Sequence, residues 1–251
     1  MKMPTIFVSH GSPLIAVEED AIKTFLQSYG SKLKPKACLV ISAHWETIDL
    51  MVSGAEHPDL IYDFYGFPEA LYEIKYPVSG EPELAHKVSE LVGAKVDDSR
   101  GLDHGAWVVM KMLFPDADVP VVQLSISSGH DAEWHYKLGK KLRQLREEGY
   151  LVVASGGLVH NLRTLQWNNK KAPVSSWSKK FLNAFETMLF EQGALSVLNP
   201  NSFPSGERAV PTMDHYTPFF VAAGAGGELK AKKIYDDWHY GTLSMQIYEW
   251  K

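Results

Sequence analysis

Short apolar runs alternate along this chain with longer segments that have helical periodicity. The runs are rich in β-branched and aliphatic residues, predict strands, and cover residues 5–9, 38–43, 119–126, 150–155 and 243–248. Between them, residues 83–92 and 131–148 place apolar side chains on one helical face, for example Leu84 and Val88 in the first segment. Strands that alternate with helices form a mostly parallel sheet with helices on both faces. The pattern therefore predicts an α/β fold.

The length of the chain favours one domain. Its 251 residues, 45% of them hydrophobic, are enough for one sizeable core, and no internal repeat interrupts them. Residues 168–178 and 199–211 are polar or rich in proline, and we expect both to be surface loops. Neither is long enough for an interdomain linker, so residues 1–251 are predicted to form a single domain.

Composition excludes several classes of partner. A net charge of −5 gives no basic field for a phosphate backbone, so nucleic acid is not an expected partner. No stretch approaches the roughly 18 apolar residues of a membrane span, and the amino terminus carries no leader pattern, so we expect a soluble, cytoplasmic protein. Cys38 is the single cysteine, which excludes an intrachain disulfide and a thiolate cluster. Any bound metal would have nitrogen and oxygen ligands.

Three histidines come at or shortly after the ends of predicted strands: His10, His44 and His160. In an open α/β sheet, ligands bind outside the carboxyl ends of the strands, so these side chains could converge on one small volume. Neutral imidazole is also the commonest side-chain metal ligand. A single histidine before a glycine, such as His10, could merely cap its strand. Several at strand ends favour a metal centre.

Two further histidines have less regular surroundings. His215 opens a helical run and could be a metal ligand or a helix-terminal residue beside the capping Asp214. His104 lies between two glycines and follows Asp103, and an imidazole held by a neighbouring carboxylate suits either a residue that supports a ligand or a proton shuttle. The remaining histidines are predicted to be structural or solvent-facing: His57, His86, His130, His135 and His239.

Paired glycines precede His160. Gly156 and Gly157 permit close backbone approach, but no lysine follows at P-loop spacing and the pattern does not match a dinucleotide fingerprint. A phosphate-binding loop is therefore not predicted here.

These motifs together resemble the LigB-type, or class III, extradiol ring-cleaving dioxygenases, in the branch of 4,5-DOPA extradiol dioxygenase-like proteins. The resemblance covers almost the whole chain. It is carried by His-Gly-Ser-Pro at residues 10–13, Ser-Ala-His-Trp at 42–45, the aromatic segment 62–72 with Tyr76-Pro77, Gly-Leu-Asp-His-Gly-Ala-Trp at 101–107, residues 121–125, Val-His-Asn-Leu-Arg at 159–163 and Asp-His-Tyr at 214–216.

The resemblance implies a three-layer α/β/α domain of the phosphorylase/hydrolase-like type, with a central mixed sheet. It also implies one divalent metal ion per chain on His10, His44 and His215, with His160 as a fourth ligand or as the acid–base group. Better-known members use a glutamate where this chain has His215, and we expect the adjacent Asp214 to face elsewhere. An all-histidine set is neutral and suits Zn²⁺ as well as Fe²⁺. Fe²⁺ would support catalysis, and purified protein could contain Zn²⁺.

The activity implied is cleavage of a catechol-type, DOPA-like ring by O₂, outside the diol. His160 would be the base, and His104 is the second candidate for proton transfer. Arg163 could meet a substrate carboxylate. Aromatic residues that could wall the substrate are Trp45, Tyr62, Phe64, Phe67 and Trp107.

Two alternatives remain open from the sequence. Three histidines around zinc could support a hydrolase, although no carboxylate is obviously positioned as its base, and Glu46, two residues after His44, is expected to point away from the site. A non-catalytic relative could instead keep the fold and bind a peptide or small ligand. The oligomeric state is also left open.

Overall fold

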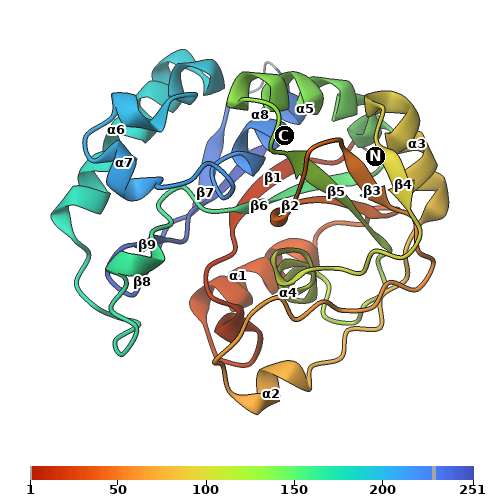
Figure 1. Ribbon diagram of the computed structural model, residues 1–251, viewed down its shortest axis with the longest axis horizontal. Helices are drawn as coiled ribbons and strands as arrows, with labels where there is room; N and C mark the ends of the chain where they lie inside the picture. The colour runs from red at the N-terminus through yellow and green to blue at the C-terminus, as the bar shows by residue number, and fades with distance from the viewer. Residues whose placement is uncertain (1, 228–229) are drawn as a thin grey trace.

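The computed structural model describes residues 2–227 and 230–251. Within these residues, eight strands form one sheet (Figure 1). Their order is β4 (Lys95–Asp97), β3 (Met51–Ser53), β5 (Val121–Ser127), β2 (Cys38–Thr47), β6 (Leu151–Gly156), β1 (Thr5–Ser9), β10 (Ile247–Trp250) and β7 (Lys232–Tyr235). A separate two-stranded sheet pairs β8 (Trp238–His239) with β9 (Leu243–Ser244).

The four central strands are parallel. β2 pairs in parallel with β5 and β6, and β6 with β1. Towards the edges, β3 is antiparallel to β5, β10 to β1, and β7 to β10. The mostly parallel, mixed sheet expected from the sequence is confirmed.

Helices cover both faces of the sheet, which gives the predicted three layers. They are α1 (Ala21–Gly30), α2 (Glu69–Tyr72), α3 (Pro82–Val92), α4 (His104–Leu113), α5 (Ala132–Glu147), α6 (Ser176–Gln192), α7 (Gly206–Ala209) and α8 (Pro218–Gly226). In Figure 1, α1 and α4 lie below the sheet, and α5 and α8 lie above it.

Side-chain alternation along the strands supplies apolar residues to both faces of the sheet. In β1, Ile6 and Val8 pack with the residues of α1 and α4, while Phe7 packs on the other face with α6 and α8. Successive side chains of a strand point to opposite faces, so a strand buried on both sides reads as a continuous apolar run. For this reason the central strands were easy to recognise from the sequence.

Two predicted strands differ from the structure. β2 continues to Thr47, so His44 lies within the strand, where the pairing with β5 shifts register between Ile41 and Glu46. The predicted strand 243–248 divides into β9 and β10, because the Met245 amide donates to the carbonyl of Asp237 instead of to a strand.

The two predicted loops are also partly helical. α6 begins at Ser176, inside the predicted loop 168–178. The 3₁₀ turn η4 (Pro200–Ser202) and α7 lie within 199–211. The first residues of α6 are polar because only part of the helix surface is buried. The sequence pattern therefore does not show where the helix begins.

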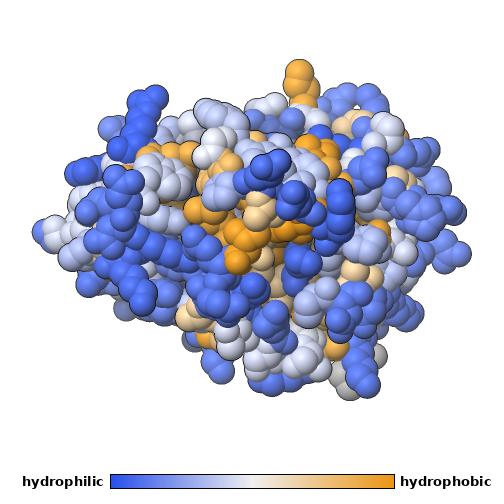
Figure 2. All heavy atoms as spheres, turned by 90° about the horizontal axis from the view of Figure 1, so that it is seen from below, coloured by the Kyte–Doolittle hydropathy of each residue, from blue (hydrophilic) through white to orange (hydrophobic). Residues whose placement is uncertain are grey.

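Among the described residues, no helix is both long and apolar enough to cross a bilayer. Seen from below, hydrophobic residues gather near the centre of the molecular face, and hydrophilic residues surround them (Figure 2). Apolar surface therefore reaches solvent on this face.

Candidate metal centre

Five histidines from different elements line one cavity of about 350 Å³. His10 follows β1, His44 lies in β2, His104 begins α4, His160 follows β6 and His215 precedes α8. Because β2, β6 and β1 are neighbours in the sheet, their carboxyl ends bring His44, His160 and His10 together. The structure thus brings together the four residues predicted as ligands and the second predicted proton-transfer residue.

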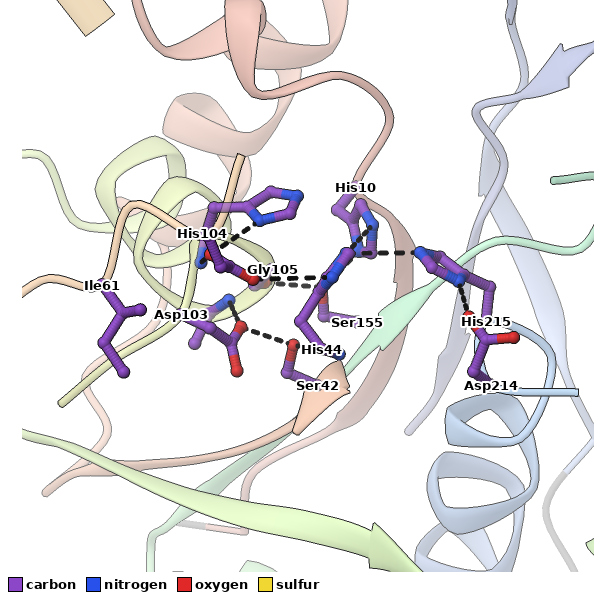
Figure 3. A network of polar contacts seen from close by, with 12 residues as sticks. His10, Ser42, His44, Ile61, Asp103, His104, Gly105, Ser155, Asp214 and His215 are labelled. Atoms are coloured by element: carbon purple, nitrogen blue, oxygen red, sulfur yellow. Dashed lines mark hydrogen bonds and ion pairs between the residues drawn. The ribbon is translucent and has the colours of Figure 1, made fainter. Parts of the chain in front are cut away.

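Three ring nitrogens approach one another closely (Figure 3). His44 Nε2 lies 3.2 Å from His10 Nε2 and 3.2 Å from His215 Nε2. Nitrogens bound tetrahedrally to one zinc ion are about 3.3–3.4 Å apart, since each Zn–N bond is about 2.0–2.1 Å. Other combinations are also close: one ring nitrogen per residue lies within 4.8 Å in the set His10, His160 and His215 and in the set His10, His44 and His104.

The hydrogen bonds of His10 fix its tautomer. Ser155 Oγ donates to the carbonyl of Gly105 at 2.6 Å, so that oxygen must accept from His10 Nδ1, which lies 2.8 Å away. A neutral imidazole carries one N–H, so His10 Nε2 presents a lone pair to the cavity. Burial lowers the pKa of His10 well below its ordinary value, and His44 and His215 lower it further. His10 is therefore a neutral nitrogen donor.

His215 is held in the same way by Asp214. Its Nδ1 contacts Asp214 Oδ2, so its Nε2 is the nitrogen with the lone pair. As expected, Asp214 does not face the converging nitrogens: its carboxylate lies behind the ring of His215. Burial opposes ionisation of Asp214, but the contact with His215 outweighs burial and lowers the Asp214 pKa. A carboxylate behind a metal-binding histidine increases the basicity of the ring.

His44 completes the converging set. Its Nδ1 lies 3.6 Å from Asp63 Oδ2, and its Nε2 points towards His10 and His215. Burial, with the nearby His104 and His215, lowers the pKa of His44 to about 2. Lone pairs of neutral imidazoles at this separation repel one another, so the arrangement fits a bound cation, and the donor set fits Zn²⁺ or Fe²⁺.

His104 is held by a carboxylate that sequence reasoning did not identify. Asp63 Oδ1 accepts from His104 Nδ1 at 2.9 Å and from the His104 backbone amide at 2.9 Å. The neighbour named from the sequence, Asp103, instead caps α4 and contacts Ser42 and Gln123. A residue in an irregular loop has no periodicity that reveals its partner. The only available signal was a carboxylate within the aromatic segment 62–72.

His160 stacks on His215, with ring centroids 3.5 Å apart and ring planes 7° from parallel. Burial lowers the pKa of His160 well below its ordinary value, and His215 lowers it further. Within the described residues, no side-chain hydrogen bond holds its ring, and only its backbone amide is tied, to the carbonyl of Ala209. His160 is thus the least constrained ring of the cluster.

Glycines allow the chain to approach these rings. A Cβ on Gly156 would overlap the carbonyl oxygen of His215, and one on Gly105 would lie 2.9 Å from His44 Cδ2. The close backbone approach predicted at Gly156 is present, and it admits the backbone of His215.

Only part of the expected aromatic wall lines the cavity. Phe64 and Phe67 do, together with Tyr65 and Trp167, which the sequence did not indicate. Trp107 is fully buried in the core, and the Tyr62 hydroxyl donates to the carbonyl of Ile74 at 2.7 Å.

Three more residues considered from the sequence also lie outside the cavity lining. Trp45 packs beneath the guanidinium of Arg100 at 4.9 Å. Arg163 and Glu46 are exposed. The suggested contact between Arg163 and a substrate carboxylate is therefore not supported, and Glu46 is not placed to act as the base of a zinc hydrolase.

Comparison with known proteins agrees with this geometry. Residues 4–249 match the family described as the catalytic LigB subunit of aromatic ring-opening dioxygenase. The chain belongs to the LigB family of extradiol dioxygenases. It is therefore an oxidoreductase of the ring-opening class, as the sequence motifs suggested.

Individual relatives cover nearly the whole chain. It is 40% identical to a 4,5-DOPA dioxygenase extradiol of Beta vulgaris, over 98% of this chain and 95% of that protein. It is 40% identical to a protein of the same name from Escherichia coli K12, over 89% of this chain and 85% of the relative. The crystal structure of an uncharacterized E. coli K12 protein superposes with a TM-score of 0.85 at 34% identity, and covers 100% of both chains.

Proposed function

We propose that this protein opens the ring of a catechol with dioxygen, outside the diol, at one metal ion held by His10, His44 and His215. The observation that carries this proposal is the convergence of three Nε2 atoms, two of them with Nδ1 already engaged in hydrogen bonds. The metal is Fe²⁺ in the working enzyme, and the same nitrogen donors also accept Zn²⁺. His160 is either a fourth ligand or the acid–base group.

The bound metal supplies positive charge that favours the ionised catechol and open positions that hold both reactants. The chain supplies the proton acceptors. His160 and His104 both line the cavity, and a neutral imidazole can take the proton of a catechol hydroxyl and later return it. Among the described residues no side-chain hydrogen bond occupies the ring nitrogens of His160, so a lone pair is available for this role.

The cavity suits a single aromatic ring with a small substituent. Its volume of about 350 Å³ is at the lower end of ordinary ligand pockets. Phe64 and Phe67 offer ring edges and faces to an aromatic substrate and limit the entry of water. The names of the relatives point to a DOPA-like catechol as the substrate class.

Oxygen uptake by protein reconstituted anaerobically with Fe²⁺ tests this proposal. Addition of DOPA or another catechol should consume oxygen and form a yellow ring-opened product. His44→Ala should abolish both, while the exposed His86→Ala should retain them. No uptake by protein that contains stoichiometric iron would overturn the proposal.

A further inference from the structure

The loop between β3 and α2 brings one carboxylate close to two of the five histidines. Asp63 Oδ1 accepts both the backbone N–H and the ring Nδ1–H of His104, each at 2.9 Å. Its other oxygen, Oδ2, lies 3.6 Å from His44 Nδ1. The rings of His44 and His104 lie against each other, with centroids 3.9 Å apart. Asp63 thus holds the proposed proton acceptor His104 by two hydrogen bonds and lies next to the proposed ligand His44.

The contact with Asp63 determines which nitrogen of His104 can accept a proton. Because Nδ1–H donates to Asp63, the neutral ring carries its lone pair on Nε2. Phe64 packs edge-on against the same ring, with centroids 5.6 Å apart, so the ring is held by packing as well as by hydrogen bonds. His104 is therefore prepared to accept a proton at a defined atom.

The other carboxylates near the cluster do not offer this arrangement. Among the five histidines, Asp214 contacts the proposed ligand His215 and forms no hydrogen bond with a proposed proton acceptor. Asp103 is fully buried and is occupied by the amide of Ala106 and by Ser42 and Gln123. Asp63 is also the single carboxylate among the described residues that line the cavity.

We infer that Asp63 is a positioning residue that acts through His104. While His160 remains the candidate base for one catechol hydroxyl, Asp63 holds the tautomer of His104 whose Nε2 takes the proton of the other. In this transfer the substrate O–H bond breaks, its electron pair stays on oxygen, and the proton bonds to Nε2. The imidazolium so formed keeps its Nδ1–H on Asp63. The catalytic part of this inference rests on the proposed function.

Kinetics at saturating metal provide the first test. Asp63→Asn keeps the shape of the side chain but removes its charge, and we expect kcat to fall roughly 10- to 100-fold with little change in KM. Asp59→Asn, an exposed carboxylate of the same loop, should leave both constants unchanged. A large rise in KM with unchanged kcat for Asp63→Asn would overturn the inference.

A double-mutant cycle separates positioning from a general loss of structure. If Asp63 acts through His104, the variant with both Asp63→Asn and His104→Gln should lose no more kcat than His104→Gln alone. Losses that multiply would show that Asp63 acts independently of His104 and would contradict the inference.

The tautomer itself can be measured without turnover. In zinc-loaded protein with ¹⁵N-labelled histidine, His104 Nδ1 should be protonated and Nε2 bare, with the signals assigned by their loss in His104→Gln. Asp63→Ala should move the proton to Nε2, and an unchanged tautomer would overturn the inference. Wild-type protein that consumed no oxygen would remove the proposed function, and this spectrum would still decide whether Asp63 sets the tautomer.

Discussion

At the amino end of β1 a buried arginine has its donors paired with carbonyl oxygens, whereas at the carboxyl end imidazole lone pairs converge without a partner. Arg146, fully buried near the end of α5, donates to the carbonyls of Met3, Ala225, Gly226 and Trp250 at 2.8–3.4 Å. It thereby joins both chain termini to the end of α8. Polar groups that are satisfied stabilise the fold, and those left to converge are available for a ligand.

The same helix shows the contrast within one residue type. His135, near the start of α5, is fully buried, and both of its ring nitrogens have partners. Ser127 N–H donates to Nε2 at 3.1 Å, and Nδ1 donates to the carbonyl of Asp131 at 2.7 Å. Burial of a histidine is therefore not what marks the site. What distinguishes the histidines of the site is an Nδ1 atom held by a hydrogen bond and an Nε2 atom that faces another Nε2.

The largest effect is expected at the carboxyl end of β1, where the histidines converge. His160→Ala should retain the metal and lose roughly two to four orders of magnitude in kcat, because a general base contributes about that much. Metal content and oxygen uptake, measured on the same sample, check the outcome. If the variant instead loses the metal, His160 is a ligand and proton transfer rests on His104 alone.

At the amino end of β1, Arg146→Met should lower the free energy of unfolding by about 3–5 kcal/mol, since several buried carbonyls lose their donor. Metal affinity should not change. Arg143→Met, an exposed position one turn earlier, is the matched control and should have little effect on stability. Urea denaturation of the metal-free proteins measures the difference, and equal stabilities of the two variants would contradict the contrast between the ends.

An intermediate effect is expected where the chain folds closely around the cluster. Gly156→Ala would place a methyl group against the carbonyl of His215 and should cost about 1–3 kcal/mol of stability while weakening metal binding. Gly129→Ala, where the nearest atom would be 3.7 Å away, should be tolerated. Metal titration and thermal denaturation of both variants test the difference. Unchanged metal affinity in Gly156→Ala would indicate that the position of His215 is not critical.

The smallest effect concerns His135 and pH. Burial lowers the pKa of His135 below its ordinary value near 6.5. Below pH 6.5 the unfolded chain binds a proton at this histidine that the folded chain does not. The free energy of unfolding therefore decreases as the pH falls. The limiting slope is about 1.4 kcal/mol per pH unit. Between pH 6.5 and 5.5, His135→Gln should therefore lose about 1 kcal/mol less stability than wild type. Parallel pH profiles for the two proteins would refute this.

The sequence predicted the sheet and the meeting of the histidines for the same physical reason. Strands such as β1 and β6 are buried on both faces, so their apolar runs are continuous, and their carboxyl ends define where His10 and His160 must lie. His215 was harder to place, because it follows a loop with short helical turns. The resemblance to the LigB family supplied its predicted role.

The sequence did not predict a contact made from a loop or the directions of two aromatic side chains. Asp63 reaches His104 from 41 positions away, and no periodic pattern relates the two. Trp107 and Trp45 were proposed as pocket walls because aromatic residues flank the motifs, but each packs into the core. Motif position identifies the neighbourhood of a site, whereas the direction of a side chain depends on tertiary packing.

Anomalous diffraction at the zinc edge, from crystals of this protein loaded with Zn²⁺, tests the central claim most directly. We expect one strong peak about 2.0–2.1 Å from the Nε2 atoms of His10, His44 and His215. A peak centred on His10, His44 and His104 without His215, or the absence of any peak in the cavity, would contradict the assignment.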